Sequence, residues 1–254
     1  MWGVFTPPLA NHLNNHMLDI FKTNNIPEST ELGMGTDRLE DCLNREHFLN
    51  YSKNIDYKFN SHGYRDNEWP DDLSNVVWCV GCSAVLGTGQ PFNETWPQLL
   101  ETKINKRCLN IGEEGCSNDT IRMRTEHIHK TYQPKQMIIM WSCFNRRRKD
   151  GQDVQHDKAD FGATADIKNF ANNFKKIKNL DTNVIHLVVP DALLDLEQWD
   201  QERFRYFLKK SSLFADEDVD NFLLFSHLDK ARDFLHFDIK TSQYITDRIV
   251  ENIH

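Results

Sequence analysis

Short apolar runs alternate with helical patterns over most of the chain after residue 75, and this alternation restricts the fold more than any other feature. The first run, residues 76–80, reads Val-Val-Trp-Cys-Val and ends at Gly81. A short apolar run bounded by a turn residue is typical of a strand buried on both faces. By the same pattern, further strands are predicted at 107–111, 137–141, 184–189 and 222–225.

Segments with helical spacing separate these runs. In residues 166–178, for example, Ile167, Phe170, Phe174 and Ile177 fall on one face of a helix. Strands that alternate with helices predict a parallel sheet covered on both faces, with ligands at the carboxyl ends of the strands. We therefore expect an α/β protein, a three-layer α/β/α sandwich with a parallel, flavodoxin-like sheet of about five strands. Helices are predicted at 94–104, 119–132, 166–178 and 240–253.

The composition excludes several functional classes. Of the 254 residues, 39% are hydrophobic and 27% are charged, which is enough apolar material for a core. With a formal net charge of −8, the chain lacks the excess of basic residues that is typical of a general nucleic-acid binder. No apolar run approaches the roughly 18 to 20 residues of a membrane helix. We expect neither nucleic acid nor a membrane span.

The cysteines and the N-terminus bear on the cellular compartment. Six cysteines are too few for a disulfide scaffold. The first ten residues lack a basic residue ahead of an apolar core and include Pro7 and Pro8, so no secretory signal is predicted. These features predict reduced thiols and a cytoplasmic location, although a mature secreted chain would begin in the same way.

The N-terminal part of the sequence differs from the rest. Residues 1–58 are polar and rich in Asn, with short helical patterns at 18–21 and 39–49. We predict a partly helical N-terminal extension that can pack on the main domain. Residues 59–254 then form the main domain, with a partly helical insertion around 191–220.

The loop after the first predicted strand places a serine, Ser83, at the carboxyl edge of the sheet. A phosphate-binding P-loop has four residues between its glycines and then Lys. Here five residues separate Gly81 from Gly87, and no Lys follows. A nucleophile elbow of the type Gly-x-Ser-x-Gly needs glycine where Val85 stands. Taken alone, Ser83 could simply cap a helix.

A histidine that could activate this serine precedes the last predicted helix. Asp233 lies three residues before His236, so one turn can bring the carboxylate to the ring N–H. Such a contact fixes the tautomer and leaves the other ring nitrogen free to take a proton from a hydroxyl. Asp-x-x-His alone is a weak signal, but Ser83 supplies the hydroxyl that such a base requires.

Four stretches carry a resemblance that covers most of residues 60–254. Gly-x-Ser followed by glycines and Trp-Pro-x-Leu-Leu lies at 81–100, and Asn-x-Gly-x-x-Gly lies at 110–115. Asp-x-x-His lies at 233–236, and Asn-x-x-Gly-x-Arg lies upstream at 60–65. In this order the stretches resemble the motif blocks of the SGNH (GDSL-like) serine hydrolases.

The resemblance implies a role for each matching residue. Ser83 would attack an acyl carbonyl, His236 would take its proton, and Asp233 would orient the imidazole ring. The backbone N–H groups of Ser83 and Gly115, with the side chain of Asn145, would form the oxyanion hole. The resemblance implies neither a metal nor another cofactor.

Two positions depart from the family pattern. Cys82 stands where the family has the aspartate of Gly-Asp-Ser. The third block, Gly-x-Asn-Asp, is poorly kept in residues 141–146, where an ungapped comparison puts Phe144 in place of the amide. Asn145 is then the nearest candidate donor, with Ser142 as a substitute or the role unfilled.

Other residues have alternative interpretations. Cys79 and Cys82 have Cys-x-x-Cys spacing, but Cys79 lies within a predicted buried strand and no second pair exists, so neither a redox nor a zinc site is expected. His127 and His129 point in different directions on a helix. The basic run 146–149 is predicted as an exposed loop or, less simply, as a contact for an anionic substrate. An aromatic set in the insertion is predicted as local core or as a platform for sugar rings: Trp199, Phe204, Tyr206 and Phe207.

Together these features predict a serine esterase that hydrolyses a small acyl ester through a Ser83-His236-Asp233 triad and an acyl-enzyme. An acetyl group on a carbohydrate is one candidate substrate, so the expected partner is a small ester or an acylated glycan. A lipase or thioesterase is an alternative. Another is a catalytically weak or inactive SGNH-fold module that binds glycans or serves a structural purpose.

Overall fold

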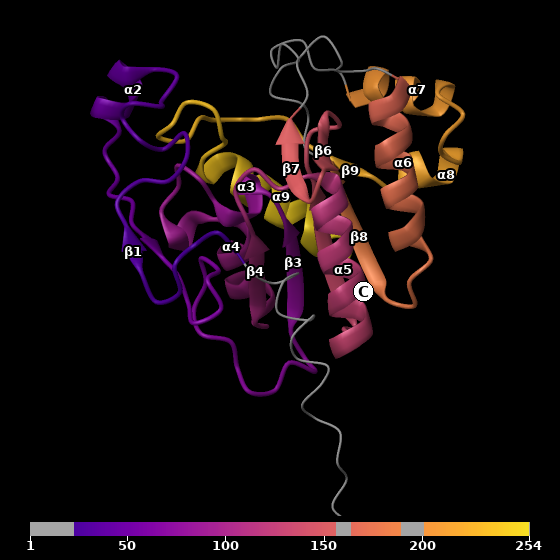
Figure 1. Ribbon diagram of the computed structural model, residues 1–254, viewed down its shortest axis with the longest axis horizontal. Helices are drawn as coiled ribbons and strands as arrows, with labels where there is room; N and C mark the ends of the chain where they lie inside the picture. Colours follow the sequence, from indigo (N-terminus) through magenta and orange to yellow (C-terminus); the bar gives the residue numbers. More distant parts are fainter. Residues whose placement is uncertain (1–22, 156–163, 189–200, 254) are drawn as a thin grey trace, which may run out of the picture.

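The computed structural model describes residues 23–155, 164–188 and 201–253, and its centre is a parallel sheet (Figure 1). The strands lie in the order β4-β3-β5-β8-β9 and all neighbours run parallel. This order is that of a flavodoxin-like sheet. The predicted fold class is confirmed. The strands are β3 (Val77–Gly81), β4 (Cys108–Gly112), β5 (Gln136–Trp141), β8 (Asn183–Val188) and β9 (Leu223–Leu224).

Helices cover both faces of the sheet. The helices α4 (Trp96–Ile104) and α9 (Ile239–Val250) pack together on one face. The helices α5 (Asn118–Tyr132) and α6 (Thr164–Lys178) pack together on the other face (Figure 1). All residues of β3, β4 and β5 are buried, because both faces of the sheet are covered. This burial explains why the strands read as continuous apolar runs in the sequence.

A hairpin follows β5 where an exposed loop was one of the expectations. Strand β6 (Arg146–Lys149) pairs antiparallel with β7 (Gln152–Gln155). Two residues of β6 contact the neighbouring helices: Arg147 pairs with the buried Asp166, and the backbone N–H of Arg148 donates to Asp119 at 2.9 Å. The prediction of a loop is wrong because contacts with α5 and α6, rather than strand propensity, order this basic segment.

The insertion and the region around Ser83 contain further short helices. Within the insertion, α7 (Gln201–Lys210) and α8 (Asp216–Asp220) are helical, while residues 191–200, including Trp199, lie outside the described residues. Phe204 stacks on Phe144 with ring centroids 5.8 Å apart, as expected for local core, whereas Tyr206 is 63% exposed. Ser83 begins the one-turn helix α3 (Ser83–Leu86), and the 3₁₀ helix η1 (Phe92–Glu94) follows.

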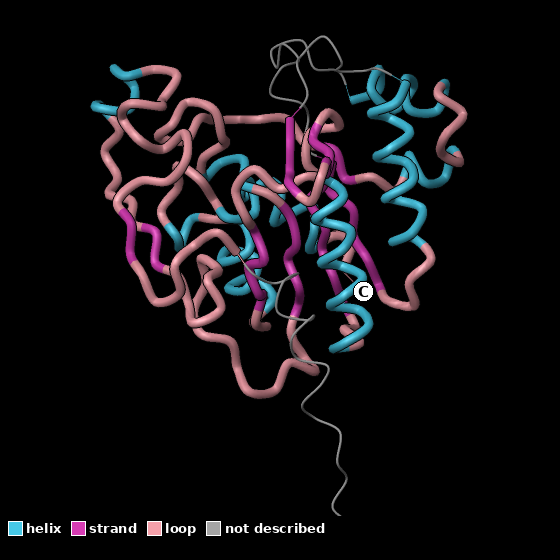
Figure 2. The backbone as a smooth tube through the Cα atoms, in the orientation of Figure 1, coloured by secondary structure: helices cyan, strands magenta, loops and turns pink. Residues whose placement is uncertain are grey.

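The described N-terminal segment, residues 23–58, consists mainly of loops (Figure 2). A two-residue strand β1 (Thr30–Glu31) pairs with β2 (Tyr57–Lys58), and the helix α2 spans Arg45–Asn50. Helix α2 begins after Asn44, whose side chain accepts a hydrogen bond from the backbone N–H of His47. The helical pattern predicted at 39–49 is thus realised only in its last residues. The pattern at 18–21 lies outside the described residues.

The described residues also bear on membranes, thiols and metals. None of the helices in the described ranges combines the length and the apolar character of a membrane-spanning segment. All six cysteines are free thiols. Within the same ranges, no group of three or more His, Cys, Asp or Glu side chains is arranged to hold a metal ion.

Candidate active site

The sheet places Ser83 at the carboxyl end of its second strand in space, β3. Cys82 is extended and precedes the first turn of α3, which ends at Gly87 with a φ of 80°. Gly81 must be small, because a Cβ there would lie 2.7 Å from the carbonyl oxygen of Met140 on the adjacent strand. The close approach of β3 to β5 and the tight turn after it present the Ser83 side chain at the edge of the sheet.

The Asp-x-x-His segment folds back on itself as predicted. The backbone N–H of Phe234 donates to the carbonyl of Ala231 at 2.9 Å, and Phe234 takes a left-handed φ of 61°. The Oδ1 atom of Asp233 accepts from the backbone N–H groups of Leu235 and His236 at 3.1 and 3.0 Å. These contacts fix the carboxylate within one turn of the histidine ring.

Ser83, His236 and Asp233 form a continuous hydrogen-bonded chain. Ser83 Oγ lies 2.7 Å from His236 Nε2, and His236 Nδ1 lies 2.6 Å from Asp233 Oδ2. An ionised Asp233 can only accept, so the ring proton lies on Nδ1 and Nε2 accepts from the serine hydroxyl. Both distances are those of hydrogen bonds, and the distance from Ser83 to His236 is short enough for proton transfer to the ring.

The electrostatics of the site keep Asp233 charged. Asp233 has no exposed side-chain surface, and burial alone would raise its pKa. The nearby His236, with hydrogen bonds from His236 and Thr36, outweighs burial and lowers the pKa of Asp233 to about 2. The carboxylate is therefore ionised at neutral pH and can stabilise an imidazolium.

Arg65, from the upstream Asn-x-x-Gly-x-Arg stretch, holds the loop that follows α3. Its buried guanidinium donates to the carbonyls of Gly87 at 2.6 Å and Gln90 at 2.7 Å, and to that of Asp56 at 3.0 Å. It also lies over the ring of Tyr57, 4.2 Å from the centroid. Sequence comparison indicated this arginine only through the family pattern, whereas the structure shows what it binds.

The Asn-x-Gly-x-x-Gly loop connects β4 to the serine-bearing turn. Asn110 Nδ2 donates to the carbonyl of Val85 at 2.8 Å, and its Oδ1 accepts from the backbone N–H of Gly112 at 3.0 Å. A Cβ at Gly112 would lie 2.1 Å from the backbone nitrogen of Leu86, so only glycine allows this packing. Gly115 is exposed, with a φ of 72° and no atom within 4 Å of an ideal Cβ.

The expected third donor of the oxyanion hole lies in the turn after β5. Asn145 is fully buried there, at the carboxyl end of the strand that adjoins β3. Phe144 is directed away into the core, where it stacks on Phe170 with centroids 4.5 Å apart. The Ser142 hydroxyl accepts from Arg146 at 3.3 Å. Of the three residues considered as the donor, Phe144 is therefore unsuitable, because it has no polar side-chain atom and packs in the core.

One contact to Asp233 was not indicated by the sequence. Thr36, in the N-terminal segment, donates its hydroxyl to Asp233 Oδ2 at 2.6 Å, across 197 positions of the chain. No motif or periodicity links these positions, because the contact depends on how a loop folds over the domain. Only an alignment with relatives that have the same N-terminal segment could have indicated this contact.

The other sequence features lie in structural environments. Cys79 is fully buried in β3, and burial raises the pKa of its thiol well above the usual value. His129 Nδ1 is hydrogen bonded to the hydroxyl of Thr182 at 2.8 Å. The burial of Cys79 matches its interpretation as a structural residue, whereas His129 is half-buried and hydrogen bonded rather than part of a solvated face.

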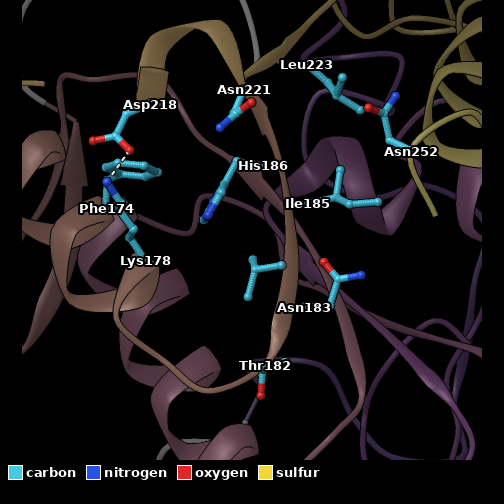
Figure 3. A pocket seen from close by; sticks show the side chains of 11 residues that line it. Phe174, Lys178, Thr182, Asn183, Ile185, His186, Asp218, Asn221, Leu223 and Asn252 are labelled. Carbon is cyan, nitrogen blue, oxygen red and sulfur yellow. Dashed lines mark ion pairs between the residues drawn. The ribbon is translucent and has the colours of Figure 1, made fainter. Parts of the chain in front are cut away.

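A cavity of about 280 Å³ lies away from the triad, around the first residues of β8 (Figure 3). Ser83 follows the carboxyl end of β3, whereas this cavity lies at the amino-terminal part of β8 between α6 and α8. An ion pair between Lys178 and Asp218, 2.5 Å apart, borders it. Its histidine, His186, accepts from Trp141 Nε1 at 3.1 Å and is packed among core aromatic rings.

His186 is expected to make the stability of the protein sensitive to acid. Burial lowers its pKa to about 3, while the unfolded chain titrates near 6.5. Because the unfolded state binds the proton first, the stability contributed by neutral His186 is complete above about pH 6.5 and decreases as the pH falls toward 3. We expect the stability advantage of the wild type over His186→Asn to narrow by about 2 kcal/mol between pH 7 and pH 5.

Urea unfolding at pH 7, 6 and 5 measures this difference. Asparagine retains an acceptor near the Nδ1 position, so the Trp141 hydrogen bond need not be lost in the variant. His129→Gln is the matched control, since His129 is only half-buried. A constant difference between the wild type and His186→Asn across this pH range would contradict the assignment.

The fold and the site together define a class: α/β proteins with a Ser-His-Asp chain at the carboxyl edge of a parallel, flavodoxin-like sheet. No protein-family model and no curated protein match the sequence. Several solved structures are similar to it at low identity, and lipolytic proteins of the G-D-S-L family are among them.

Three of these structures illustrate the similarity. A family two carbohydrate esterase from Clostridium thermocellum, in complex with cellohexaose, is 14% identical, with a TM-score of 0.45 over 74% of this chain and 66% of that chain. A psychrotrophic esterase from Pseudoalteromonas sp. is 18% identical, with a TM-score of 0.45 over 70% and 96%. A lipase/acylhydrolase from Enterococcus faecalis is 14% identical, with a TM-score of 0.45 over 70% and 95%.

Proposed function

We propose that this protein is a serine esterase that hydrolyses carboxylic esters through a Ser83-His236-Asp233 triad. The observation that carries the proposal is the pair of hydrogen bonds, 2.7 Å from Ser83 to His236 and 2.6 Å from His236 to Asp233. This arrangement gives the hydroxyl a neutral base and gives that base an ionised partner.

The chemistry proceeds in two steps. Ser83 Oγ attacks the acyl carbonyl while its proton moves to His236 Nε2, and the carbonyl electron pair moves to the oxygen. Collapse of this tetrahedral intermediate expels the alcohol, which takes the proton from Nε2 and leaves an acyl-serine. Water then attacks the acyl-serine with His236 again as the base, and the carboxylic acid leaves as Ser83 regains its proton. Asp233 remains ionised throughout.

The negative oxygen of the intermediates needs hydrogen-bond donors. We assign this role to the backbone N–H groups of Ser83 and Gly115 and to the side chain of Asn145. Support comes from the turns that carry them, which follow β3, β4 and β5, three adjacent strands of the sheet. Each such donor typically lowers the barrier by about 2.7 to 4 kcal/mol.

The substrate class follows from access to the hydroxyl. Ser83 is only 5% exposed, and such restricted access favours a short acyl group over a long one. We propose a small acyl ester as the substrate and an acetylated carbohydrate as the first natural candidate to test.

The proposal is tested with two kinds of reagent. The purified protein is expected to hydrolyse p-nitrophenyl acetate faster than the octanoate ester, to release acetate from an acetylated oligosaccharide, and to be labelled by a fluorophosphonate. If the folded protein neither hydrolyses any of these esters nor is labelled, the esterase proposal fails, and a binding module of the same fold takes its place. Faster turnover of the octanoate ester would instead indicate a lipase or thioesterase.

A further inference from the structure

A turn of the N-terminal segment lies directly against the triad. Residues 34–37 form this turn, in which the backbone N–H of Asp37 donates to the carbonyl of Met34 at 2.9 Å. Gly35 has a φ of 51°, a conformation that favours glycine, and an ideal Cβ there would overlap the carboxylate of Glu114. The turn therefore packs on the loop after β4 and presents the next residue, Thr36, toward Asp233.

The hydroxyl of Thr36 completes the set of donors around the Asp233 carboxylate. Oδ2 accepts from Thr36 Oγ1 and from His236 Nδ1, each at 2.6 Å. Oδ1 accepts from the backbone N–H groups of Leu235 and His236. Three of these four donors belong to the segment that contains Asp233 itself, so Thr36 is the donor that comes from a distant part of the chain.

Asp37, the last residue of the turn, is linked by hydrogen bonds to two loops beside the triad. One is the loop that contains Asp233 and His236, and the other, reached through Tyr57, is the loop that follows α3. The buried Asp37 pairs with Arg232 through two hydrogen bonds of 2.6 and 2.5 Å. Asp37 also accepts from Tyr57 at 2.5 Å, and the Tyr57 hydroxyl accepts from the backbone N–H of Gly89 at 2.8 Å. The backbone N–H of Arg232 donates to the carbonyl of Gly89 at 3.0 Å. This network sets the position of Thr36 relative to Asp233.

We propose that Thr36 is a positioning residue of the catalytic centre, which holds the Asp233 carboxylate in the orientation that its hydrogen bond to His236 requires. The N-terminal segment thereby forms part of the active site rather than a separate arm. The expected changes in kcat and in the pH profile rest on the proposed esterase function. The expected change in the hydrogen bond between Asp233 and His236 does not.

Loss of the Thr36 hydroxyl is expected to change the basicity of the Asp233 carboxylate in a predictable direction. Oδ2 then has only His236 as a donor, so it becomes more basic and holds the imidazolium more strongly. The acidic limb of the pH profile is therefore expected at a higher pH in the variant than in the wild type. Titratable groups near the site include Glu114, whose pKa is raised by burial, and His227, whose pKa is lowered to about 4 by burial. Substitution of Thr36 leaves these two groups in place. It also leaves the ion pair between Asp37 and Arg232 in place.

The experiment compares Thr36→Val, which removes the hydroxyl at nearly constant shape, with Thr36→Ser, which retains it. In Thr36→Val we expect kcat for p-nitrophenyl acetate to fall about tenfold with KM unchanged, as for loss of one charge-assisted hydrogen bond. The acidic limb of kcat/KM should move to higher pH. Thr36→Ser should restore both properties. Thr102→Val is the matched control, because Thr102 is exposed on α4.

A second readout does not depend on activity. The 2.6 Å contact between His236 and Asp233 should give the Nδ1 proton a low-field resonance in proton NMR of the wild type. This resonance should shift in Thr36→Val and stay in place in Thr36→Ser. If the wild type hydrolyses no ester, the proposed function fails, but this resonance still tests the role of Thr36.

Thr36→Val with wild-type kcat, an acidic limb that is unchanged or displaced to lower pH, and an unshifted resonance would overturn the inference. If Thr36→Val does not fold, Thr36→Ala, which cannot clash with Asp233, is measured in its place with the same expected results. Failure of Thr36→Ser to restore the wild-type resonance would also count against the hydroxyl as the cause.

Discussion

Replacing Ser83 with alanine is expected to lower kcat for ester hydrolysis by at least about 10⁴-fold and to abolish labelling by the fluorophosphonate. The variant removes the only atom that can form the acyl-enzyme in the proposed mechanism. It should remain folded, because the removed hydroxyl contacts His236 at 2.7 Å and otherwise lies 4.0 Å from Cys82 Sγ. Assay of p-nitrophenyl acetate, with thermal unfolding of the same sample, measures both effects.

His236→Gln provides a second test of the same unit. Residues that act together in one step show non-additive losses, so the double variant Ser83→Ala with His236→Gln should be no slower than Ser83→Ala alone. Ser74→Ala and His129→Gln are matched controls in places away from the triad and should retain wild-type activity. Labelling that persists in Ser83→Ala would show that the nucleophile is another residue.

The second large effect is expected at Arg65. Arg65→Met keeps much of the side-chain volume but removes the donors that reach the carbonyls of Gly87, Gln90 and Asp56. The carbonyl of Gly87 keeps the backbone N–H of Gln90 as a donor at 3.1 Å, whereas the carbonyls of Gln90 and Asp56 lose the arginine. A buried acceptor left without a donor costs about 1 to 3 kcal/mol, so we expect the free energy of unfolding to fall by about 2 to 4 kcal/mol. Ester hydrolysis should fall as well, because the loop after α3 loses its anchor.

Urea unfolding and the ester assay measure the two consequences of Arg65→Met. Arg65→Lys should be intermediate, because a single ammonium cannot match the planar fork of donors that reaches three carbonyls. Arg248→Met is the control, since Arg248 is a surface residue paired with Glu251, and it should change stability by less than about 1 kcal/mol. Wild-type stability in Arg65→Met would show that these carbonyls do not depend on the arginine.

The strands of the sheet could be predicted because burial on both faces requires continuous apolar runs. The pattern placed the strands at β3, β4, β5, β8 and β9 within one or two residues, except that residue 189 lies outside the described part. The parallel direction of the strands also followed, since a helix separates successive strands, whereas their order in the sheet came from the structure. The hairpin β6-β7 could not be predicted, because Arg147 reads as exposed until Asp166 of α6 is placed beside it.

In the candidate site, too, some contacts could be predicted from local sequence and others could not. The contact of Asp233 with His236 lies within four residues and follows from the geometry of a single turn. The approach of Ser83 to His236 spans 153 positions and was expected only from the order of motifs that the chain shares with a known family. Whether Asn145 donates to the oxyanion remains a proposal that its place after β5 supports.

The sequence by itself determined the layered fold, the edge of the sheet where the chemistry lies, and the identity of a serine, a histidine and an aspartate as the candidates. These follow from periodicity and from short-range spacing, which act within one element or one turn. Only the tertiary structure decided what holds the candidates in place: Arg65 beneath the serine loop, Asn110 between two strands, and Thr36 on the carboxylate. Such polar contacts join loops far apart in the chain, and their energy depends on burial and orientation, neither of which a linear pattern contains.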